Sequence, residues 1–187
     1  MNTKIKISNN AFVYPMPMVI VGAKVNGKDN FMAVGWVTRV NAAPPKIAIA
    51  LGNRHHTNKG IIENQSFSIS VPSLELMQKT DYCGLVSGEK IDKSRVFEVF
   101  YGELLAVPMV KECPLCMECK LTQTVDLETN TLFIGQIMNA YTEDKYLSDG
   151  KLDVTKINPF TLTMPDNNYW SVGKNCGKAW NSGSSFK

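Results

Sequence analysis

The stretch DNFMAVGWVTRVNAAPPKIAIALGNRHHTNKGIIENQSFSISV, residues 29–71, contains most of the information about the fold of this chain. Small and apolar residues on either side of the Pro44-Pro45 pair predict two strands, over residues 31–40 and 46–51. Proline supplies no backbone donor and therefore interrupts the ladder between them. A short helix over residues 59–64 and a third strand over residues 66–71 follow. Polar groups collect at the junctions between these elements, and function should be sought there.

The turn that leads into the predicted helix has the composition of a phosphate-binding site. Thr57 or Asn58 is placed to cap the helix N-terminus, where N–H groups are free and the helix dipole favours an anion. Arg54 can add a bidentate contact, so Arg54, His55, His56 and Thr57 are the phosphate candidates. The alternative for the two histidines is a surface pair. A metal site is disfavoured, since neighbours in an extended segment point in opposite directions and no third ligand has suitable spacing.

Short motifs occur in one order along nearly the whole chain. They are NFM-x3-W from Asn30, the proline pair, ALG at 50–52, H-x-T-N-K-G-I-x-E-N-x-x-F-S from His55, PMVKECPLCMECKL at 108–121, LFIGQI at 132–137 and NYWSVGKNCGKAW at 168–180. Together they resemble the flavoredoxin family, which belongs to the FMN-binding split-barrel flavin reductases. Several motifs in the expected order are more specific than any one of them alone.

The resemblance implies a non-covalently bound FMN at the rim of a β-barrel, close to the interface of a homodimer. Carried over to this chain, together with the phosphate candidates, it gives the following cofactor-binding residues: Asn30, Met32, Ala33, Trp36, Thr38, Arg54, His56, Thr57, Lys93 and Tyr169. In similar proteins a tryptophan of the first motif lies beside the flavin, and a lysine after the helix and loop approaches the phosphate. No protein residue is predicted to be catalytic.

Each of these positions also has a plainer interpretation. A polar residue such as Asn30 at the end of a strand is most often a turn cap, and Trp36 can simply belong to the core. A lone loop lysine such as Lys93 is usually solvated. The sequence does not decide which aromatic near the C-terminus covers the flavin: Tyr169, Trp170 or Phe160.

Composition sets broad limits. The 187 residues, of which 44% are hydrophobic, suit a single domain spanning residues 1–187. A net charge of +3 without long charge runs argues against a nucleic-acid or membrane-surface protein. No apolar run approaches the roughly 20 residues that span a bilayer, and no secretory signal is evident at the start. We therefore expect a cytoplasmic protein.

Cys113, Cys116 and Cys119 form a C-x2-C-x2-C pattern, with which bacterial iron–sulfur motifs begin. The fourth ligand expected after Cys119 is missing, and the segment from Glu118 to Val125 alternates as a strand does. Ordinary strand cysteines are therefore favoured over a cluster, and no metal is predicted. The odd total of five cysteines suits reduced thiols better than a disulfide framework.

The rest of the chain predicts more strands than helices. Asn26-Gly27 indicates a hairpin between a strand over residues 17–25 and the one from Asn30. Further strands are expected over 104–107, 116–125 and 132–141, a helix from Ser73 to Tyr82, a loop over 83–97 and a short helix near 169–180. Many short strands and few helices predict a mainly β fold, a split β-barrel with a few short helices.

Three functions remain open. The first is an oxidoreductase, an NAD(P)H-dependent flavin or ferric reductase that transfers electrons or hydride through FMN. The second is an electron carrier that works between redox protein partners. The third is a non-redox ligand-binding barrel, which is disfavoured because the clustered basic and aromatic residues of single-strand binders are missing. Glycine-rich dinucleotide motifs are also missing, so NAD(P)H would dock transiently onto the flavin.

Overall fold

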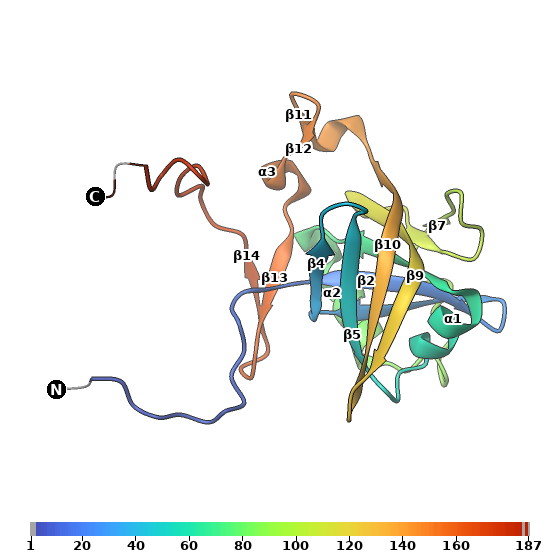
Figure 1. Ribbon diagram of the computed structural model, residues 1–187. Helices are drawn as coiled ribbons and strands as arrows, with labels where there is room; N and C mark the ends of the chain where they lie inside the picture. The colour runs from blue at the N-terminus through green and yellow to red at the C-terminus, as the bar shows by residue number, and fades with distance from the viewer. Residues whose placement is uncertain (1–2, 185, 187) are drawn as a thin grey trace.

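The computed structural model describes residues 3–184 and residue 186. Its main element is a seven-stranded sheet with the order β3-β2-β6-β9-β10-β5-β4, in which every neighbouring pair is antiparallel. The strands of this sheet are β2 (Val19–Val25), β3 (Lys28–Val34), β4 (Val37–Asn41), β5 (Lys46–Gly52), β6 (Ser66–Val71), β9 (Leu115–Asp126) and β10 (Asn130–Thr142). Figure 1 shows how they curve around a common interior.

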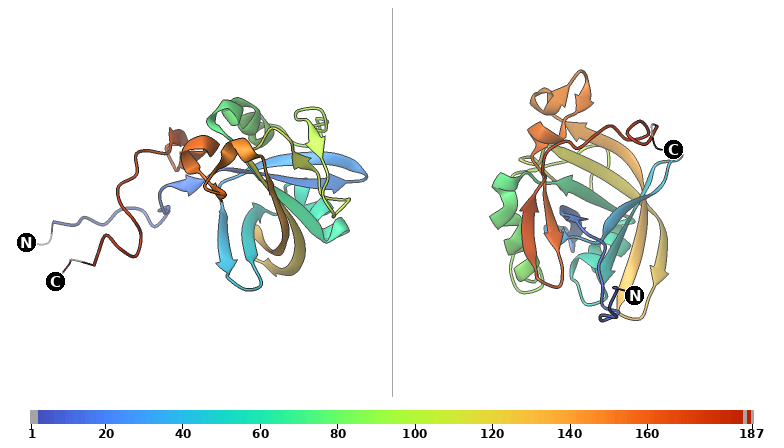
Figure 2. Two further views of the ribbon diagram at one scale, coloured as in Figure 1. Left: turned by 90° about the horizontal axis from the view of Figure 1, so that it is seen from above. Right: turned by 90° about the vertical axis from the view of Figure 1, so that its left-hand side faces the viewer.

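The two edge strands of this sheet are consecutive in the chain. Only Gly35 and Trp36 separate β3 from β4, yet the two strands lie at opposite ends of the hydrogen-bonded order. The sheet therefore curls into a barrel that is split where β3 passes into β4 (Figure 2). The predicted fold, a mainly β split barrel with a few short helices, is confirmed.

Local sequence explains the hairpin that starts the barrel. Asn26 and Gly27 join β2 to β3 with φ values of 51° and 76°. Two consecutive positive φ angles characterise the tight turn that Asn-Gly favours, because its twist matches that of the flanking strands. The predicted hairpin is confirmed, and it places Asn30 and Met32 on the strand that borders the split.

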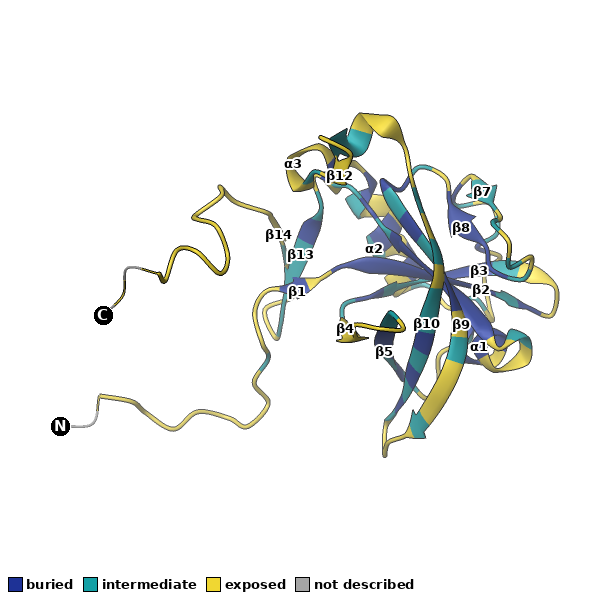
Figure 3. Cartoon of the chain, turned by 45° about the horizontal axis from the view of Figure 1, so that its top comes forward, coloured by how far each residue is buried: buried dark blue, intermediate teal, exposed yellow. Residues whose placement is uncertain are grey.

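Two apolar cores lie on the two faces of the sheet. Val21, Phe67 and Phe133 belong to the barrel interior, whereas Ile20 and Phe31 face a second core with Met109. This is why β2 is buried on nearly every residue instead of alternating (Figure 3).

Two helices flank the barrel. α1 (Thr57–Asn64) packs on β2, where a Cβ atom on Gly60 would lie 2.3 Å from the carbonyl oxygen of Lys24, so only glycine permits this approach. The 3₁₀ turn η1 (Leu74–Leu76) leads into α2 (Met77–Leu85), which lies against β3. Both helices were predicted, and α2 runs slightly into the predicted loop. No helix among the described residues has the length and apolar character needed to span a membrane.

A second sheet, with the order β1-β13-β14, stands beside the split. The remaining elements are β1 (Met16–Pro17), β7 (Val99–Phe100), β8 (Met109–Val110), η2 (Asp144–Tyr146), β11 (Leu147–Ser148), β12 (Lys151–Leu152), α3 (Val154–Ile157), β13 (Phe160–Thr163) and β14 (Asn168–Ser171). The helix predicted near residues 169–180 is wrong. Residues 168–171 pair with β13 as a strand, and the glycine-containing stretch after them is irregular.

The strand predicted over residues 104–107 is also wrong. The backbone N–H groups of Glu103 and Leu104 donate to the buried carboxylate of Glu118, at 3.2 and 3.0 Å. Asn139 and Tyr141 donate to the same carboxylate. This side-chain anchor replaces a strand partner, so the segment is a loop despite its apolar sequence.

Candidate functional site

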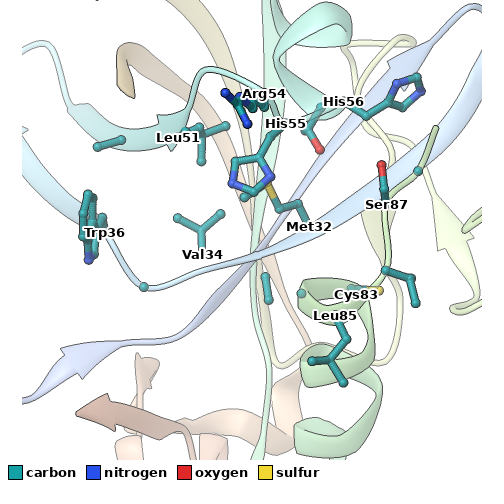
Figure 4. A pocket seen from close by; sticks show the side chains of 18 of the residues that line it. Met32, Val34, Trp36, Leu51, Arg54, His55, His56, Cys83, Leu85 and Ser87 are labelled. Carbon is teal, nitrogen blue, oxygen red and sulfur yellow. The ribbon is translucent and has the colours of Figure 1, made fainter. Parts of the chain in front are cut away.

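A cavity of about 540 Å³, here called the main pocket, opens at the split of the barrel. Its walls are the β3–β4 connection, the end of β5 with the turn into α1, the C-terminal end of α2 with the loop after it, and β13. Figure 4 shows Arg54 and His55 at one end, Trp36 at another, and Cys83 and Leu85 on the α2 side.

The turn between β5 and α1 supplies one polar wall. The N–H of His55 and the side-chain amide of Asn58 both donate to the carbonyl oxygen of Gly52, each at 3.0 Å, which fixes the turn. The N-cap residue of α1 is His56, without a side-chain capping bond, so the prediction that Thr57 or Asn58 caps the helix is wrong. Both residues lie inside the first helical turn, and their side chains have other partners.

Thr57 is held by a residue from a distant strand. Its side chain is buried, and its Oγ1 accepts a hydrogen bond of 2.8 Å from Nδ2 of Asn30 on β3. Because the oxygen is the acceptor in this bond, the hydroxyl proton of Thr57 remains available to a ligand. Asn30 therefore acts behind Thr57, and it does not itself line the main pocket.

Lys93 is buried, with 4% of its surface exposed. Its ammonium donates to the carbonyl oxygens of Phe31 at 3.0 Å and Cys83 at 2.7 Å, and so ties the loop after α2 to β3. No carboxylate forms an ion pair with it among the described residues. Burial lowers the pKa of Lys93, while the thiol of Cys83 acts in the opposite direction. One of its three donors has no assigned acceptor.

The two histidines differ in their surroundings. The ring of His55 lies against Gly52, where a Cβ atom would be 3.2 Å from it. Burial, and to a lesser extent the charge of Lys93, lower the pKa of His55, which favours a neutral imidazole. The Nδ1 atom of His56 is buried and has no hydrogen-bond partner among the described residues. A buried polar atom without a partner is costly, so this nitrogen is suited to a hydrogen bond with a ligand or water.

The other end of the main pocket is apolar. Trp36 is 43% exposed there, with its ring centroid 6.4 Å from that of Phe12. Its neighbours in the lining come from β3, β5 and the region of β13: Met32, Ala33, Val34, Leu51, Leu162 and Met164. Trp36 is thus a wall of the pocket and not a core residue. Of the two interpretations drawn from the sequence, the core one is excluded.

The main pocket brings together seven of the ten predicted cofactor-binding residues: Met32, Ala33, Trp36, Arg54, His56, Thr57 and Lys93. Thr38 is not among the lining residues. It is exposed and pairs with Ala48, two residues along β5 from Ala50. Ala50 does line the pocket, and its N–H donates to the carbonyl oxygen of Trp36 at 3.0 Å. The pocket therefore ends before Thr38.

Tyr169 lies outside the main pocket as well. Its hydroxyl donates to Asp81 Oδ1 at 2.7 Å, and its ring packs edge-on against Phe160 at 5.2 Å. Burial and the neighbouring carboxylate raise the pKa of Tyr169. These contacts attach β14 to α2. Tyr169 lines neither of the two cavities of its own chain.

Sequence reasoning missed 15 of the 22 lining residues, about two thirds of the lining. The missed residues are Val34, Gly35, Ala50, Leu51, Gly52, Cys83, Gly84, Leu85, Val86, Ser87, Gly88, Asn130, Leu162 and Met164, along with His55, which was a phosphate candidate outside the final set. The glycines at 84 and 88 were a usable signal, because small residues in a loop permit close approach to a ligand. No local pattern marks Leu162 or Met164.

A second cavity, the side pocket, has a volume of about 500 Å³. It lies on the other side of a wall formed by His56, Gly88 and Lys93, which line both cavities. Its remaining lining is Val25, Asn26, Lys28, Asp29, Asn30, Glu89, Lys90, Ile91 and Asp92.

The C-x2-C-x2-C cysteines do not share one face of the fold. Cys119 points into the barrel core, whereas Cys113 and Cys116 belong to the core on the other side of the sheet. A spacing of three along a strand places side chains on opposite faces. Burial raises the pKa of Cys116 to about 11 and that of Cys119 to about 12. All five cysteines are free thiols, and no group of metal-binding side chains occurs within the described part of the chain.

Comparison with known proteins places the chain in a family. The sequence model of the flavin reductase like domain matches residues 11–161. The crystal structure of flavoredoxin from Methanosarcina acetivorans is 54% identical and superimposes with a TM-score of 0.97, covering 98% of this chain and 99% of the other. Flavoredoxin of Desulfovibrio vulgaris (Miyazaki F) is 33% identical with a TM-score of 0.88, covering 96% and 100%.

A curated relative is a ferric-chelate reductase (NAD(P)H) from Archaeoglobus fulgidus, which is 28% identical over 129 residues, 66% of this chain and 73% of that protein. The fold is that of a flavin reductase-like split barrel. This chain belongs to the flavin reductase-like family, and within it to the flavoredoxin-type proteins.

Proposed function

We propose that this protein is an FMN-binding flavoprotein that holds the cofactor non-covalently in the main pocket and transfers electrons or hydride through it. One observation carries the proposal. The pocket has a cationic, hydrogen-bond-donating end with Arg54 and Lys93, an apolar end with Trp36, and no acidic residue anywhere in its described lining. A ligand with an anionic group at one end and a flat ring system at the other matches both ends.

The polar end fits a phosphate. The unassigned donor of Lys93, the hydroxyl proton of Thr57 and the guanidinium of Arg54, which has no ion pair among the described residues, can all donate to anionic oxygens. His56, whose Nδ1 atom has no hydrogen-bond partner among the described residues, lies in the wall that the main pocket shares with the side pocket. Charge-assisted bonds of this kind each contribute about 1.5–3 kcal/mol.

The apolar end fits an isoalloxazine ring. Met32 and Val34 on one strand, Leu162 and Met164 beside β13, and the ring of Trp36 form apolar walls around the opening. The volume of about 540 Å³ lies within the usual range for cofactor pockets.

The protein's part in the chemistry is to bind and orient. When bound, FMN supplies one- and two-electron redox chemistry at its ring, which no side chain of this protein offers. Trp36 would hold the ring at the split of the barrel, and Thr57 and Lys93 would fix the opposite end. No side chain in the lining has the arrangement of a nucleophile or of a paired general acid and base, so we assign no catalytic residue.

The electron donor we propose is NAD(P)H, which would dock onto the exposed part of the pocket. The support is family membership and the printed name of the ferric-chelate reductase relative. An electron carrier between redox proteins is the second candidate, favoured by the high identity to proteins named flavoredoxin. In either role we infer that the protein works as a homodimer.

Spectroscopy and rapid mixing test these proposals. Protein stripped of flavin should bind FMN more tightly than riboflavin, since only FMN reaches the cationic end. Stopped-flow mixing of the loaded protein with NADH, NADPH or a reduced ferredoxin should bleach the flavin absorption with a nicotinamide if the protein is a reductase. Bleaching by the protein donor alone would favour the carrier. Equal affinities for FMN and riboflavin would show that the polar end of the main pocket does not bind the phosphate.

A further inference from the structure

The N-terminal segment passes the apolar end of the main pocket before it enters the barrel. Residues 3–11 are exposed and project from the barrel, as do residues 172–184 at the other end of the chain (Figure 1). Residues 12–17, here called the strap, contact other parts of the chain instead. None of the strap residues, all of which the structure describes, lines the main pocket. Any effect of the strap on a ligand must therefore pass through the residues that it touches.

Two alternate residues of the strap hold two residues of the pocket lining. The ring of Phe12 packs on that of Trp36, with 6.4 Å between the centroids and an angle of 39° between the planes. The hydroxyl of Tyr14 donates to the carbonyl oxygen of Met164. Val13, between them, is 87% exposed. In an extended segment alternate side chains share one side, so the strap turns Phe12 and Tyr14 toward the pocket wall and Val13 toward solvent.

The next alternate residue, Met16, continues the pattern. It is buried and pairs with Leu162, where β1 meets β13. Leu162 in turn lies against the β3–β4 connection, since a Cβ atom on Gly35 would be 3.3 Å from its Cδ2 atom. The strap thus reaches three residues that line the apolar end: Trp36, Leu162 and Met164.

These three lining residues come from two sheets that share no strand. Trp36 precedes β4 at the edge of the seven-stranded sheet, whereas Leu162 lies on β13 of the small sheet and Met164 directly follows that strand. Hydrogen bonding within either sheet therefore does not fix the distance between the two sides of the apolar end. The strap contacts both sides, so it is placed to set how far apart they lie.

The side chain of Trp36 has little other support. Its backbone is fixed, because the N–H of Ala50 donates to its carbonyl oxygen at 3.0 Å. Its side chain is 43% exposed, and in the described part of the chain Phe12 is the one aromatic ring packed on it. A side chain that is free to change rotamer loses entropy when a ligand orders it, and a side chain already held in place does not.

We propose that the strap holds the apolar end of the main pocket in its ligand-binding shape, with Phe12 as the positioning residue for Trp36 and Tyr14 as the positioning residue for Met164. The inference rests on the proposed function, because it requires the flavin ring to lie at this end. Its consequence is that residues outside the pocket help to set the affinity for the ring, whereas the polar end of the pocket sets the affinity for the phosphate.

Flavin titration of the full chain is the first test. Phe12→Ala should weaken FMN and riboflavin by the same factor, about two- to tenfold, because either flavin must then order a loose Trp36. Phe12→Tyr keeps the ring and should bind both flavins like the parent protein, and so should Val13→Ala at the exposed neighbour. Far-UV circular dichroism checks that the variants are folded. Unchanged binding in Phe12→Ala, or an equal loss in Val13→Ala, overturns the proposal.

A double-mutant comparison separates positioning from other roles. Phe12→Ala should cause no further loss in a Trp36→Ala background, because the residue through which Phe12 acts is gone. A Phe12 that touched the flavin itself, or that merely stabilised the fold, would cost the same factor in both backgrounds. That result overturns the role of Phe12.

Tyr14→Phe tests the other side of the apolar end. It keeps the ring and removes only the donor to the carbonyl oxygen of Met164. Both flavins should bind about two- to threefold more weakly, a small loss because the bond is made by an exposed tyrosine. Binding equal to that of the parent protein overturns the role of Tyr14.

Fluorescence of the flavin-free protein tests the strap without any ligand. The chain has three tryptophans, so Trp170→Phe with Trp180→Phe leaves Trp36 as the only reporter. Its anisotropy should decay faster on the nanosecond timescale after Phe12→Ala, and not after Val13→Ala. Equal decays with and without Phe12 overturn the proposal, whatever the protein binds. If Phe12 restrains Trp36 in a protein that binds neither flavin, the strap stands and the proposed function fails.

Discussion

The main pocket and the side pocket have nearly equal volumes, about 540 and 500 Å³, and share a wall of His56, Gly88 and Lys93, yet their linings differ in charge. The main pocket has two cations and no acidic residue. The side pocket has Lys28, Lys90 and Lys93 against three carboxylates: Asp29, Glu89 and Asp92. The balance of charge in the lining, and not the volume, therefore distinguishes a candidate anion site from a neutral cavity.

The carboxylates of the side pocket also have partners already. Asp29 accepts from the hydroxyl of Tyr101 at 2.7 Å, Glu89 pairs with Lys59 at 3.4 Å, and Asp92 accepts from the N–H of Ser94 at 2.9 Å. In the main pocket the donors of Arg54 and Lys93 and the Nδ1 atom of His56 are not fully used. Matched substitutions in the two pockets therefore test whether only the main pocket binds an anion.

The largest effect is expected for Lys93→Met. It removes a cation from the phosphate end and leaves the carbonyl oxygens of Phe31 and Cys83 without their donor. FMN affinity should fall roughly 10- to 150-fold, as for the loss of a charge-assisted bond of about 1.5–3 kcal/mol. Lys90→Met in the side pocket is the matched control and should bind FMN normally. Flavin fluorescence titration measures both. The same loss in the two variants would remove the distinction between the pockets.

A smaller loss, about tenfold, is expected for Thr57→Val, which keeps the shape of the side chain but removes its hydroxyl. Thr57→Ser keeps the hydroxyl and should bind FMN nearly as well as the parent protein. Riboflavin, which has no phosphate, should bind all three proteins alike. If Thr57→Val weakens riboflavin and FMN equally, Thr57 acts on packing and not on a phosphate.

Trp36→Ala tests the apolar end. Since Trp36 is partly exposed, its loss should weaken FMN and riboflavin by the same factor, roughly three- to tenfold, as for the loss of an aromatic contact of about 0.5–1.5 kcal/mol. Tryptophan fluorescence of the parent should be quenched by flavin and recover when flavin is removed. Unchanged flavin binding in a correctly folded variant would place the ring elsewhere.

The smallest effect concerns pH. The pKa of His55 lies below its ordinary value of 6.5 in the folded chain, so the unfolded chain binds the proton more readily. Its contribution to stability is fully present above pH 6.5 and is lost as the pH falls from there through the lowered pKa. The midpoint of thermal unfolding should fall less steeply in this window for His55→Gln than for the parent. Identical pH profiles would show that His55 is not in the environment described.

Much of the fold was predictable because its signals are local. The Asn26-Gly27 turn, the proline pair and the alternation in β5, β9 and β10 each depend on neighbours in the chain, and the structure has all of them in place. The family motifs located the β3–β4 connection and the turn before α1, which together supply most of the predicted site residues.

The errors share one cause, which is that distant partners override local pattern. The carboxylate of Glu118 holds residues 103 and 104 in a loop, Asp81 holds Tyr169 outside the pocket, and Asn30 binds the Thr57 hydroxyl that was predicted to cap the helix. Each contact joins residues more than ten positions apart, so no window of sequence contains it.

The amino-acid sequence alone predicts the strand pattern, the hairpins, the helix beside the candidate phosphate end and the family, because these depend on backbone preferences and on ordered motifs. Tertiary structure decided that Lys93 is buried between β3 and α2, that Leu162 and Met164 close the apolar end, and that the chain ends project with their apolar side chains exposed. Those features depend on which segments the curled sheet brings together around its split.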